Sequence, residues 1–291
     1  MQIDPQGPKL KRQALKALRL SALKSQNLAS RKMLCDPAGT VDVSLTSYGD
    51  RLATVGYAIE SIAQGDTLPR RLILWVSDHG FDLADYPLLA RLVRRGLEIR
   101  ETPDYGPYKK SYPYAVRLRT PGIDLVTADD DVLYPKGWLA GLLRAAQEHP
   151  GDVIGYRGAA VSFDADGAAL PYAQWRRLSA PEAGNHVLLT GVAGIYYPFA
   201  FLAHLADQGE AFRANCPSAD DFWMHRLSLL AGVRPRSIES GSMYLLSIPR
   251  TQRNPLHRIN VTAGQNDVQF AAITTAEELA AIRRSAQESV T

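Results

Sequence analysis

The sequence predicts an α/β fold with an open, mainly parallel sheet that carries helices on both faces. Short apolar runs of strand length alternate along the chain with amphipathic segments of helix length. With 291 residues the chain suits one large domain or two small ones. Its 46% hydrophobic and 22% charged residues exclude a fully disordered chain, and no apolar stretch has the roughly 18 residues of a membrane span.

A basic arm precedes this body and is predicted to occupy residues 1–38. Residues 1–33 hold eight Lys or Arg against Asp4 alone, a net +7, whereas the whole chain is +3 and the remainder −4. A helix is expected from Lys9 to about Lys24. The apolar face expected for this helix comprises Leu10, Ala14, Ala17 and Leu18. Such a helix either lies on an anionic membrane leaflet or docks on the body as an ordinary surface helix.

The first part of the body reads as alternating strands and helices. Residues 41–45 alternate apolar and polar side chains, as a half-buried strand does. Residues 53–64 are predicted to be helical. Residues 71–76 form an apolar run typical of a buried parallel strand. A helix over residues 88–95 follows Pro87, which suits a helix start.

The same alternation continues towards the middle of the chain. Residues 97–100 and 123–127 are predicted strands, and residues 137–148 a predicted helix. Residues 150–250 mix short apolar runs with Gly and Pro, and no linker forces a second domain. The body is therefore expected over residues 39–275, followed by a C-terminal helix or tail over residues 276–291.

An acidic loop ends one buried strand. Asp129, Asp130 and Asp131 directly follow the strand at residues 123–127, and ligands of open α/β sheets bind beyond such strand ends. Adjacent carboxylates repel each other, and Mg²⁺ or Mn²⁺ would balance them. Alternation along an extended chain would turn Asp129 and Asp131 to one side and Asp130 to the other. The alternatives are a solvated acidic turn or an Asp that caps the next helix.

Several segments together resemble a bacterial glycosyltransferase family of the GT-A fold, often found in capsule and surface-polysaccharide pathways. The resemblance covers about residues 40–270 and rests on the order and spacing of its pieces. These are Leu45-Thr-Ser-Tyr-Gly-Asp-Arg, Gly106-Pro-Tyr-Lys-Lys, Asp129-Asp-Asp-Val-Leu-Tyr-Pro-Lys-Gly-Trp, Thr190-Gly-Val-Ala-Gly-Ile-Tyr-Tyr-Pro, Asp220-Asp-Phe-Trp and Gly264-Gln-Asn-Asp.

The resemblance implies a GT-A-like fold and a metal-assisted donor site. It implies that Asp129 and Asp131 hold Mn²⁺ or Mg²⁺, which would neutralise the leaving diphosphate. It places Asp130 near the sugar or ribose. His257 either completes the metal shell, as a late His does in some GT-A enzymes, or is a loop histidine bonded to a backbone carbonyl.

Two further segments are donor-site candidates. Thr46, Ser47, Tyr48 and Arg51 follow the first strand, where GT-A folds usually grip the nucleotide; helix capping by Ser47 or Asp50 is the alternative.

The second segment is Lys109-Lys110, which lies in a Gly/Pro loop and suits phosphate binding. The nearby Tyr105, Tyr108, Tyr112 and Tyr114 either stack on a base or sugar, or form a partly buried cluster beside a solvated turn.

An acidic pair opens a later apolar helix. Asp220 and Asp221 either stabilise the helix N-terminus through its dipole or take part in catalysis. By resemblance to inverting GT-A enzymes, Asp221 would be the general base and Asp220 would contact the acceptor. Burial beside Phe222 and Trp223 would raise the pKa of the base towards the working range.

The sequence therefore predicts a metal-dependent glycosyltransferase that moves a sugar from a nucleoside diphosphate-sugar to a glycan or lipid-linked acceptor in surface-polysaccharide synthesis. No role with nucleic acid is expected. Two cysteines, Cys35 and Cys216, favour the cytoplasm, with peripheral contact of residues 9–24 at the inner membrane. The alternatives are a sugar nucleotidyltransferase and a non-catalytic glycan- or nucleotide-binding module.

Overall fold

The computed structural model describes residues 9–238, 245–249 and 264–289. Its main sheet has eight strands in the order β3-β2-β1-β4-β11-β6-β12-β9. The strands are β1 (Val41–Thr46), β2 (Arg71–Val76), β3 (Leu97–Glu101), β4 (Asp124–Ala128), β6 (Val153–Gly155), β9 (Glu182–Ala183), β11 (Ile195–Tyr197) and β12 (Pro235–Ser237). β11 and β9 run against the other six, so the predicted open, mainly parallel sheet is confirmed.

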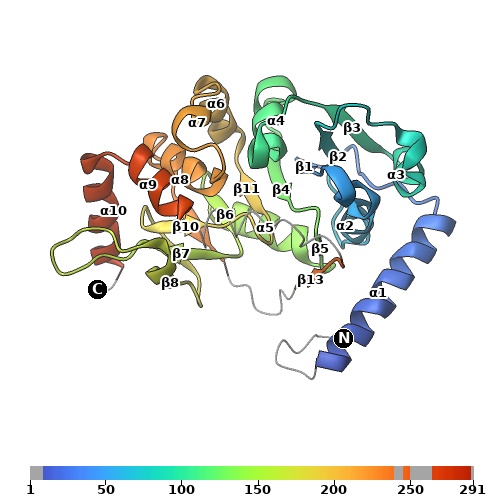
Figure 1. The fold of residues 1–291 in the computed structure, drawn as a ribbon, viewed down its shortest axis with the longest axis horizontal. Helices are drawn as coiled ribbons and strands as arrows, with labels where there is room; N and C mark the ends of the chain where they lie inside the picture. Colours follow the sequence, from blue (N-terminus) through green and yellow to red (C-terminus); the bar gives the residue numbers. More distant parts are fainter. Residues whose placement is uncertain (1–8, 239–244, 250–263, 290–291) are drawn as a thin grey trace.

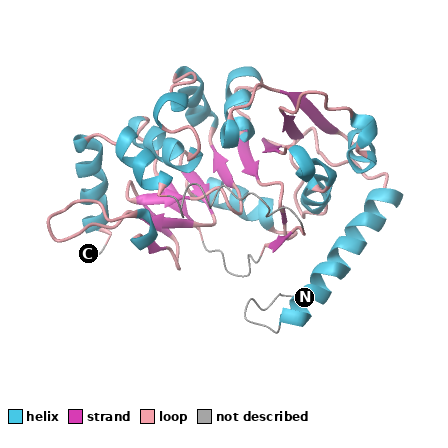
Figure 2. Ribbon diagram, in the orientation of Figure 1, coloured by secondary structure: helices cyan, strands magenta, loops and turns pink. Residues whose placement is uncertain are grey.

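Helices lie on both sides of this sheet (Figure 2). They are α1 (Lys9–Ala29), α2 (Val55–Ala63), α3 (Pro87–Val93), α4 (Tyr112–Arg117), α5 (Trp138–Glu148), α6 (Phe199–Asp207), α7 (Phe212–Asn215), α8 (Asp220–Leu230), α9 (Gln265–Ile273) and α10 (Ala276–Glu288). A second sheet joins β10 (Val187–Leu189), β7 (Gly158–Ala160) and β8 (Arg176–Arg177), and β13 (Leu246–Ser247) pairs with β5 (Val132–Leu133).

Two hydrophobic cores arise because successive strand residues point to opposite faces. In β2, Ile73 packs with α4, α6 and α8, whereas Leu72 and Leu74 pack with α2, α3 and α5. The same alternation separates Leu125 from Val126 in β4. The sheet is thus buried on both faces, as its apolar strands require.

The predicted strands and helices from β1 to α5 are present, with ends shifted by at most two residues, and α1 extends to Ala29, five residues beyond its expected end. The structure adds what the sequence did not resolve beyond residue 150, above all β11, which inserts antiparallel between β4 and β6. It also packs α10 on the body through the fully buried Ile282. A capping box starts α10: Thr275 accepts from the Glu278 N–H, and Glu278 accepts from the Thr275 N–H.

Helix α1 docks on the body by a different face from the predicted one. The fully buried Leu23 packs beside Ala58 and Leu133, and Asn27 hydrogen-bonds Glu60 and the Leu88 carbonyl. The expected stripe instead faces away, since Ala14 and Ala17 are exposed and Leu18 is 68% exposed. The N-terminal half of α1 extends away from the body (Figure 1). Among the described helices, none is long and apolar enough to span a membrane.

Candidate active site

The candidate site lies at the edge of the sheet where the parallel strands end. β1, β2 and β4 present their carboxyl ends there, so the segments that follow them meet in space. β11 is antiparallel to β4 and therefore begins at this same edge. This topology brings the turn at residues 191–194 beside the acidic loop.

The three aspartates of the loop have different partners. Asp130 is buried. It accepts a 2.6 Å hydrogen bond from the Ser47 hydroxyl and forms an ion pair with Arg51 at 2.8 Å. The other Arg51 nitrogen lies 3.6 Å from Asp131. Asp129 instead pairs with Lys110 at 3.2 Å. The capping alternatives are wrong: no side chain caps the short helix at Gly49–Ala53, where Ser47 instead binds Asp130, and none caps the helix that begins at Trp138.

Burial dominates the electrostatics of Asp130. Loss of solvent raises the pKa of its carboxyl above the usual range, although Arg51 and the Ser47 hydroxyl both act to lower it. Negative charge on Asp129 adds to the rise. Burial is thus the main reason that the Asp130 carboxyl is hard to ionise.

Tyr134 fixes the backbone of this loop. Its buried hydroxyl accepts a 2.6 Å hydrogen bond from the Asp129 N–H, and its ring packs on Trp138 with 4.3 Å between centroids. The Tyr134 N–H in turn donates to the Ser61 hydroxyl of α2. The loop conformation is thus tied to two helices of the body.

Lys110 connects the loop to the acidic pair on α8. Its ammonium lies 3.2 Å from Asp129 and 3.5 Å from Asp220. Burial alone would lower the pKa of Lys110, but the charges of Asp220, Asp129 and Asp221 outweigh it and raise the pKa well above its ordinary value. Lys110 is therefore a permanent cation at the centre of three carboxylates.

Asp221 is the carboxylate with the clearest shift. Burial raises its pKa to about 8, with the charge of Asp220 as the next cause, whereas Lys110 and the Gly191 N–H lower it. The Gly191 N–H donates to Asp221 Oδ1 at 2.9 Å. At neutral pH this side chain keeps its proton, and it loses it within the range where a general base works.

A strained turn carries that N–H group. Ala193 has φ +78°, the only positive φ of a non-glycine residue in the described ranges, and Gly194 has φ +87°. Such a conformation costs an alanine about 1–3 kcal/mol and persists only where the surroundings enforce it. Strand β11 begins only after this turn, at Ile195.

Lys109 and its neighbours form an enclosed corner rather than a solvated turn. The Lys109 side chain is 4% exposed, bonds the Ser77 hydroxyl at 2.7 Å and pairs with Asp104 at 2.8 Å. Its ammonium also lies 5.4 Å from the ring centre of Tyr48, which is 42% exposed. Tyr48 is thus an accessible aromatic ring between Lys109 and Arg51.

Of the two alternatives for the other tyrosines, the structure shows the buried cluster. They pack inside one core, where Tyr108 stacks on Phe212 at 3.9 Å. The buried residues of this set are Tyr105, Tyr108, Tyr112 and Tyr114. Thr46 also turns inward, since its hydroxyl donates to the Trp75 carbonyl at 3.0 Å.

Of the three predicted metal ligands, the structure describes two, Asp129 and Asp131. His257 lies outside the described residues. Within the described ranges, no group of three or more His, Cys, Asp or Glu side chains is placed to hold a metal ion. Asp129 and Asp131 keep side chains that are 23% and 18% exposed, so both remain accessible to a ligand.

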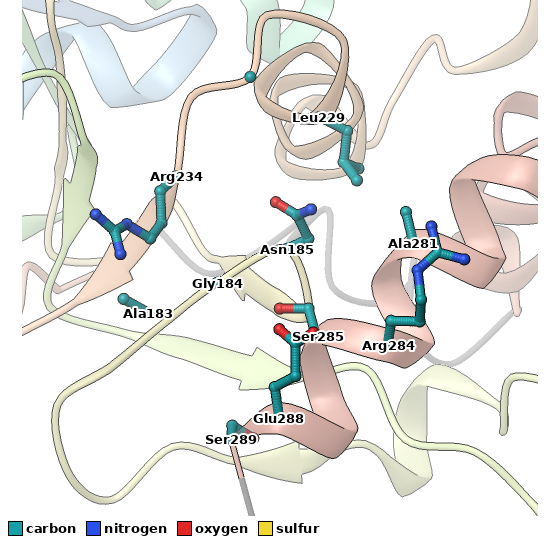
Figure 3. A pocket seen from close by; sticks show the side chains of 11 residues that line it. Ala183, Gly184, Asn185, Leu229, Arg234, Ala281, Arg284, Ser285, Glu288 and Ser289 are labelled. Carbon is teal, nitrogen blue, oxygen red and sulfur yellow. The ribbon is translucent and has the colours of Figure 1, made fainter.

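A cavity of the protein lies away from the candidate site. Its volume is about 500 Å³, and it opens beside Leu229 at the C-terminal end of α8 and Ser285 of α10 (Figure 3). Asp220 and Asp221 stand at the opposite end of α8. The cavity contains none of the predicted site residues.

Sequence reasoning missed Tyr134, Ser77 and Asp78. Asp78 accepts a 2.6 Å hydrogen bond from the Gly49 N–H and so orders the segment beside Tyr48. Ser77 and Asp78 follow β2 as the acidic loop follows β4, so the rule that ligands bind beyond strand ends would have found them. No comparable signal marks Tyr134, because its role depends on the loop folding back.

No protein-family model and no curated protein sequence matches the chain. Among solved structures, the chain is similar to the mannosyltransferase PcManGT from Pyrobaculum calidifontis in complex with GDP-Man and Mn²⁺. That comparison has 15% identity and a TM-score of 0.50, and covers 89% of this chain and 73% of PcManGT.

Two further structures give lower scores. S. aureus TarS 1-349 has 16% identity and a TM-score of 0.49, with 72% of this chain covered; the match spans only 60% of the TarS fragment. A 4-diphosphocytidyl-2C-methyl-D-erythritol synthase has 12% identity and a TM-score of 0.43, over 76% of this chain and 98% of the synthase. The fold of this chain is GT-A-like, and its reaction has to be argued from the site.

Proposed function

We propose that this chain is a glycosyltransferase that moves a sugar from a nucleoside diphosphate-sugar to a glycan or lipid-linked acceptor in surface-polysaccharide synthesis. One observation carries the proposal: the acidic loop at the end of β4 faces the acidic pair of α8 across Lys110. A transferase needs such a pair of centres, one for the leaving diphosphate and one for the incoming hydroxyl.

The donor would bind along the ends of β1 and β4. Tyr48 offers an accessible ring for the base, and Arg51 beside it offers positive charge for phosphate. The enclosed Lys109 would support this donor site by holding the ring of Tyr48. Thr46 and Ser47 would hold this segment in place through their hydrogen bonds to the Trp75 carbonyl and to Asp130. The buried Asp130 orients Arg51 and would lie near the ribose or sugar. Lys110 would reach the diphosphate from the opposite side.

Asp129 and Asp131 are the proposed ligands of Mn²⁺ or Mg²⁺. Both are carboxylates with accessible oxygens, and Mg²⁺ sites commonly use one or two carboxylates together with substrate phosphates and water. The similar PcManGT structure is a complex with GDP-Man and Mn²⁺. When bound, the ion would neutralise charge on the leaving diphosphate. His257 remains a candidate third ligand.

Asp221 is the proposed general base and Asp220 the proposed acceptor contact. The Gly191 N–H occupies one oxygen of Asp221 and leaves the other for the acceptor hydroxyl. Because the pKa of Asp221 is about 8, the base form is the minority below that pH. Transfer is therefore expected to rise with pH towards about 8.

Thermal shift with nucleoside diphosphates, with and without Mn²⁺, tests the donor site. A ligand at about 100 times its Kd adds about 2.7 kcal/mol of stability. Stabilisation that depends on Mn²⁺, together with release of nucleoside diphosphate in the presence of acceptor, supports the proposal. Pyrophosphate release from nucleoside triphosphate and sugar phosphate would instead identify a nucleotidyltransferase. Binding without turnover would identify a binding module.

We further propose that α1 contacts an anionic membrane surface. Its outward stripe includes Leu18 and Leu28, which are 68% and 60% exposed, and residues 1–33 carry a net charge of +7. Each basic residue near an anionic bilayer contributes about 1 kcal/mol.

Flotation with phosphatidylglycerol vesicles should therefore recover the wild type and lose Leu18→Glu. The matched control Leu230→Glu, at a site 54% exposed, should float as wild type. Equal flotation of all three proteins would contradict the membrane contact.

A further inference from the structure

Trp138 stands between the acidic loop and the turn that holds Asp221. It is the first residue of α5 and is almost fully buried. Its ring packs on Tyr134, whose hydroxyl binds the Asp129 N–H. On its other side, the indole N–H donates to the Ala193 carbonyl at 2.6 Å. One side chain thus touches both halves of the candidate site.

The turn that Trp138 holds is closed and tightly fitted. The Gly194 N–H donates to the Gly191 carbonyl at 2.9 Å. A Cβ at Gly194 would come within 2.7 Å of both the Thr127 carbonyl and the Trp138 ring. The turn is therefore pressed between the end of β4 and the indole, and Ala193 keeps its left-handed conformation within it.

This turn aims one N–H group at the carboxylate of α8. Gly191 donates to Asp221 Oδ1, and a Cβ on Gly191 would meet Lys110 Nζ at 2.8 Å. The backbone thus approaches the charged cluster as closely as only a glycine permits. A shift of the turn by a few tenths of an ångström would lengthen the bond to Asp221.

We propose that Trp138 is a positioning residue: its indole N–H holds the strained turn at residues 191–194 so that the Gly191 N–H orients Asp221 towards the acceptor. The inference rests on the proposed role of Asp221 as the base. Trp138 itself touches no reacting atom. Its contacts also fix the position of the acidic loop relative to Asp221, because the same ring packs on Tyr134.

Several charged and titratable groups face Asp221, and the test has to hold them constant. Asp220 lies beside it on α8, Lys110 comes from the turn before α4, Asp129 from the acidic loop and Tyr197 from β11. Trp138→Phe changes none of these. It removes only the indole N–H and part of the ring.

The experiment compares Trp138→Phe with the matched control Trp175→Phe. Trp175 is also almost fully buried and packs on Phe222, next to Asp221, but its indole N–H donates to the Leu170 carbonyl at 2.7 Å and not to the turn at residues 191–194. In a ¹³C carboxyl NMR titration, Trp138→Phe should raise the pKa of Asp221 by about one unit, the effect of weakening one hydrogen bond to a carboxylate. Trp175→Phe should leave that pKa unchanged.

Kinetics give the second readout. For Trp138→Phe, kcat should fall about tenfold or more with little change in the donor KM, and its pH profile should move to higher pH. If that variant does not fold, Gly194→Ala displaces the same turn and should show the same alkaline shift. An Asp221 pKa that is unchanged in the folded variant would overturn the positioning role. Since the titration needs no turnover, a failure of the proposed reaction remains distinguishable.

Discussion

Two buried acidic centres of this protein differ in how their charge is balanced. Asp42 of β1 is fully buried; it accepts two hydrogen bonds from Arg70 at 2.8 and 2.7 Å and one from Tyr114 at 2.9 Å. At the candidate site, Lys110 pairs with both Asp129 and Asp220, and Arg51 pairs with both Asp130 and Asp131. Asp42 thus has a bidentate arginine and a tyrosine hydroxyl for one carboxylate, whereas at the candidate site each cation is shared between two carboxylates, as is common where a ligand binds.

Removing the base should give the largest effect. Asp221→Asn keeps an oxygen for the Gly191 N–H but cannot accept a proton, so kcat should fall by roughly 10²–10⁴. Stabilisation by nucleoside diphosphate and Mn²⁺ should persist in thermal shift. A variant with wild-type turnover would show that Asp221 is not the base.

Removing the shared cation should come next. Lys110→Met leaves Asp129, Asp220 and Asp221 without their common partner, and losing one electrostatic contact of this kind costs roughly 10²–10³ in rate. The loss should appear in turnover of the nucleotide-sugar and in a weaker thermal shift with nucleotide. Turnover and nucleotide binding at wild-type levels would show that Lys110 has no role in the site.

Breaking the satisfied centre should affect stability and not chemistry. Asp42→Asn removes the negative partner of Arg70, and breaking a buried pair costs about 3–5 kcal/mol; because Arg70 is 20% exposed, we expect the lower end. Urea unfolding measures the loss. Turnover per folded molecule should stay at the wild-type value. A change in turnover would show that Asp42 contributes to the function of the site.

The last prediction concerns the pH dependence of stability. The pKa of Asp221 is about 8 in the folded state and near 4 when unfolded, so folding is penalised as pH rises through this window. Asp221→Asn lacks that penalty. Its free energy of unfolding relative to wild type should therefore increase from pH 4 to pH 8 and level off above. A difference that is constant with pH would contradict the raised pKa.

The sequence was most informative where local pattern decides structure. β2 is an apolar run because helices cover both faces of the sheet, and β1 shows the alternation typical of a strand. β11 is three residues long and follows a glycine-rich turn, so neither its presence nor its direction has a local signal. The apolar stripe predicted for α1 does not contact the body. The helix docks through Leu23 instead, because the docking face depends on the surface of the body that it meets.

The candidate site divides in the same way. The position of Asp129, Asp130 and Asp131 beyond a strand end followed from the pattern. Their link to Asp220 through Lys110 did not, because it depends on where a short turn lies relative to a distant helix. The assignment of roles to these residues came from resemblance and stays a prediction.

The antiparallel insertion of β11 also has a consequence for how the chain is made. β4 is complete at Ala128, but its partner ends at Tyr197, about 70 residues later. At roughly 5–20 residues per second of synthesis, one side of β4 stays unpaired for several seconds on the ribosome. An open strand edge of that kind invites pairing with other chains, so slow translation of this stretch should raise aggregation of the nascent protein.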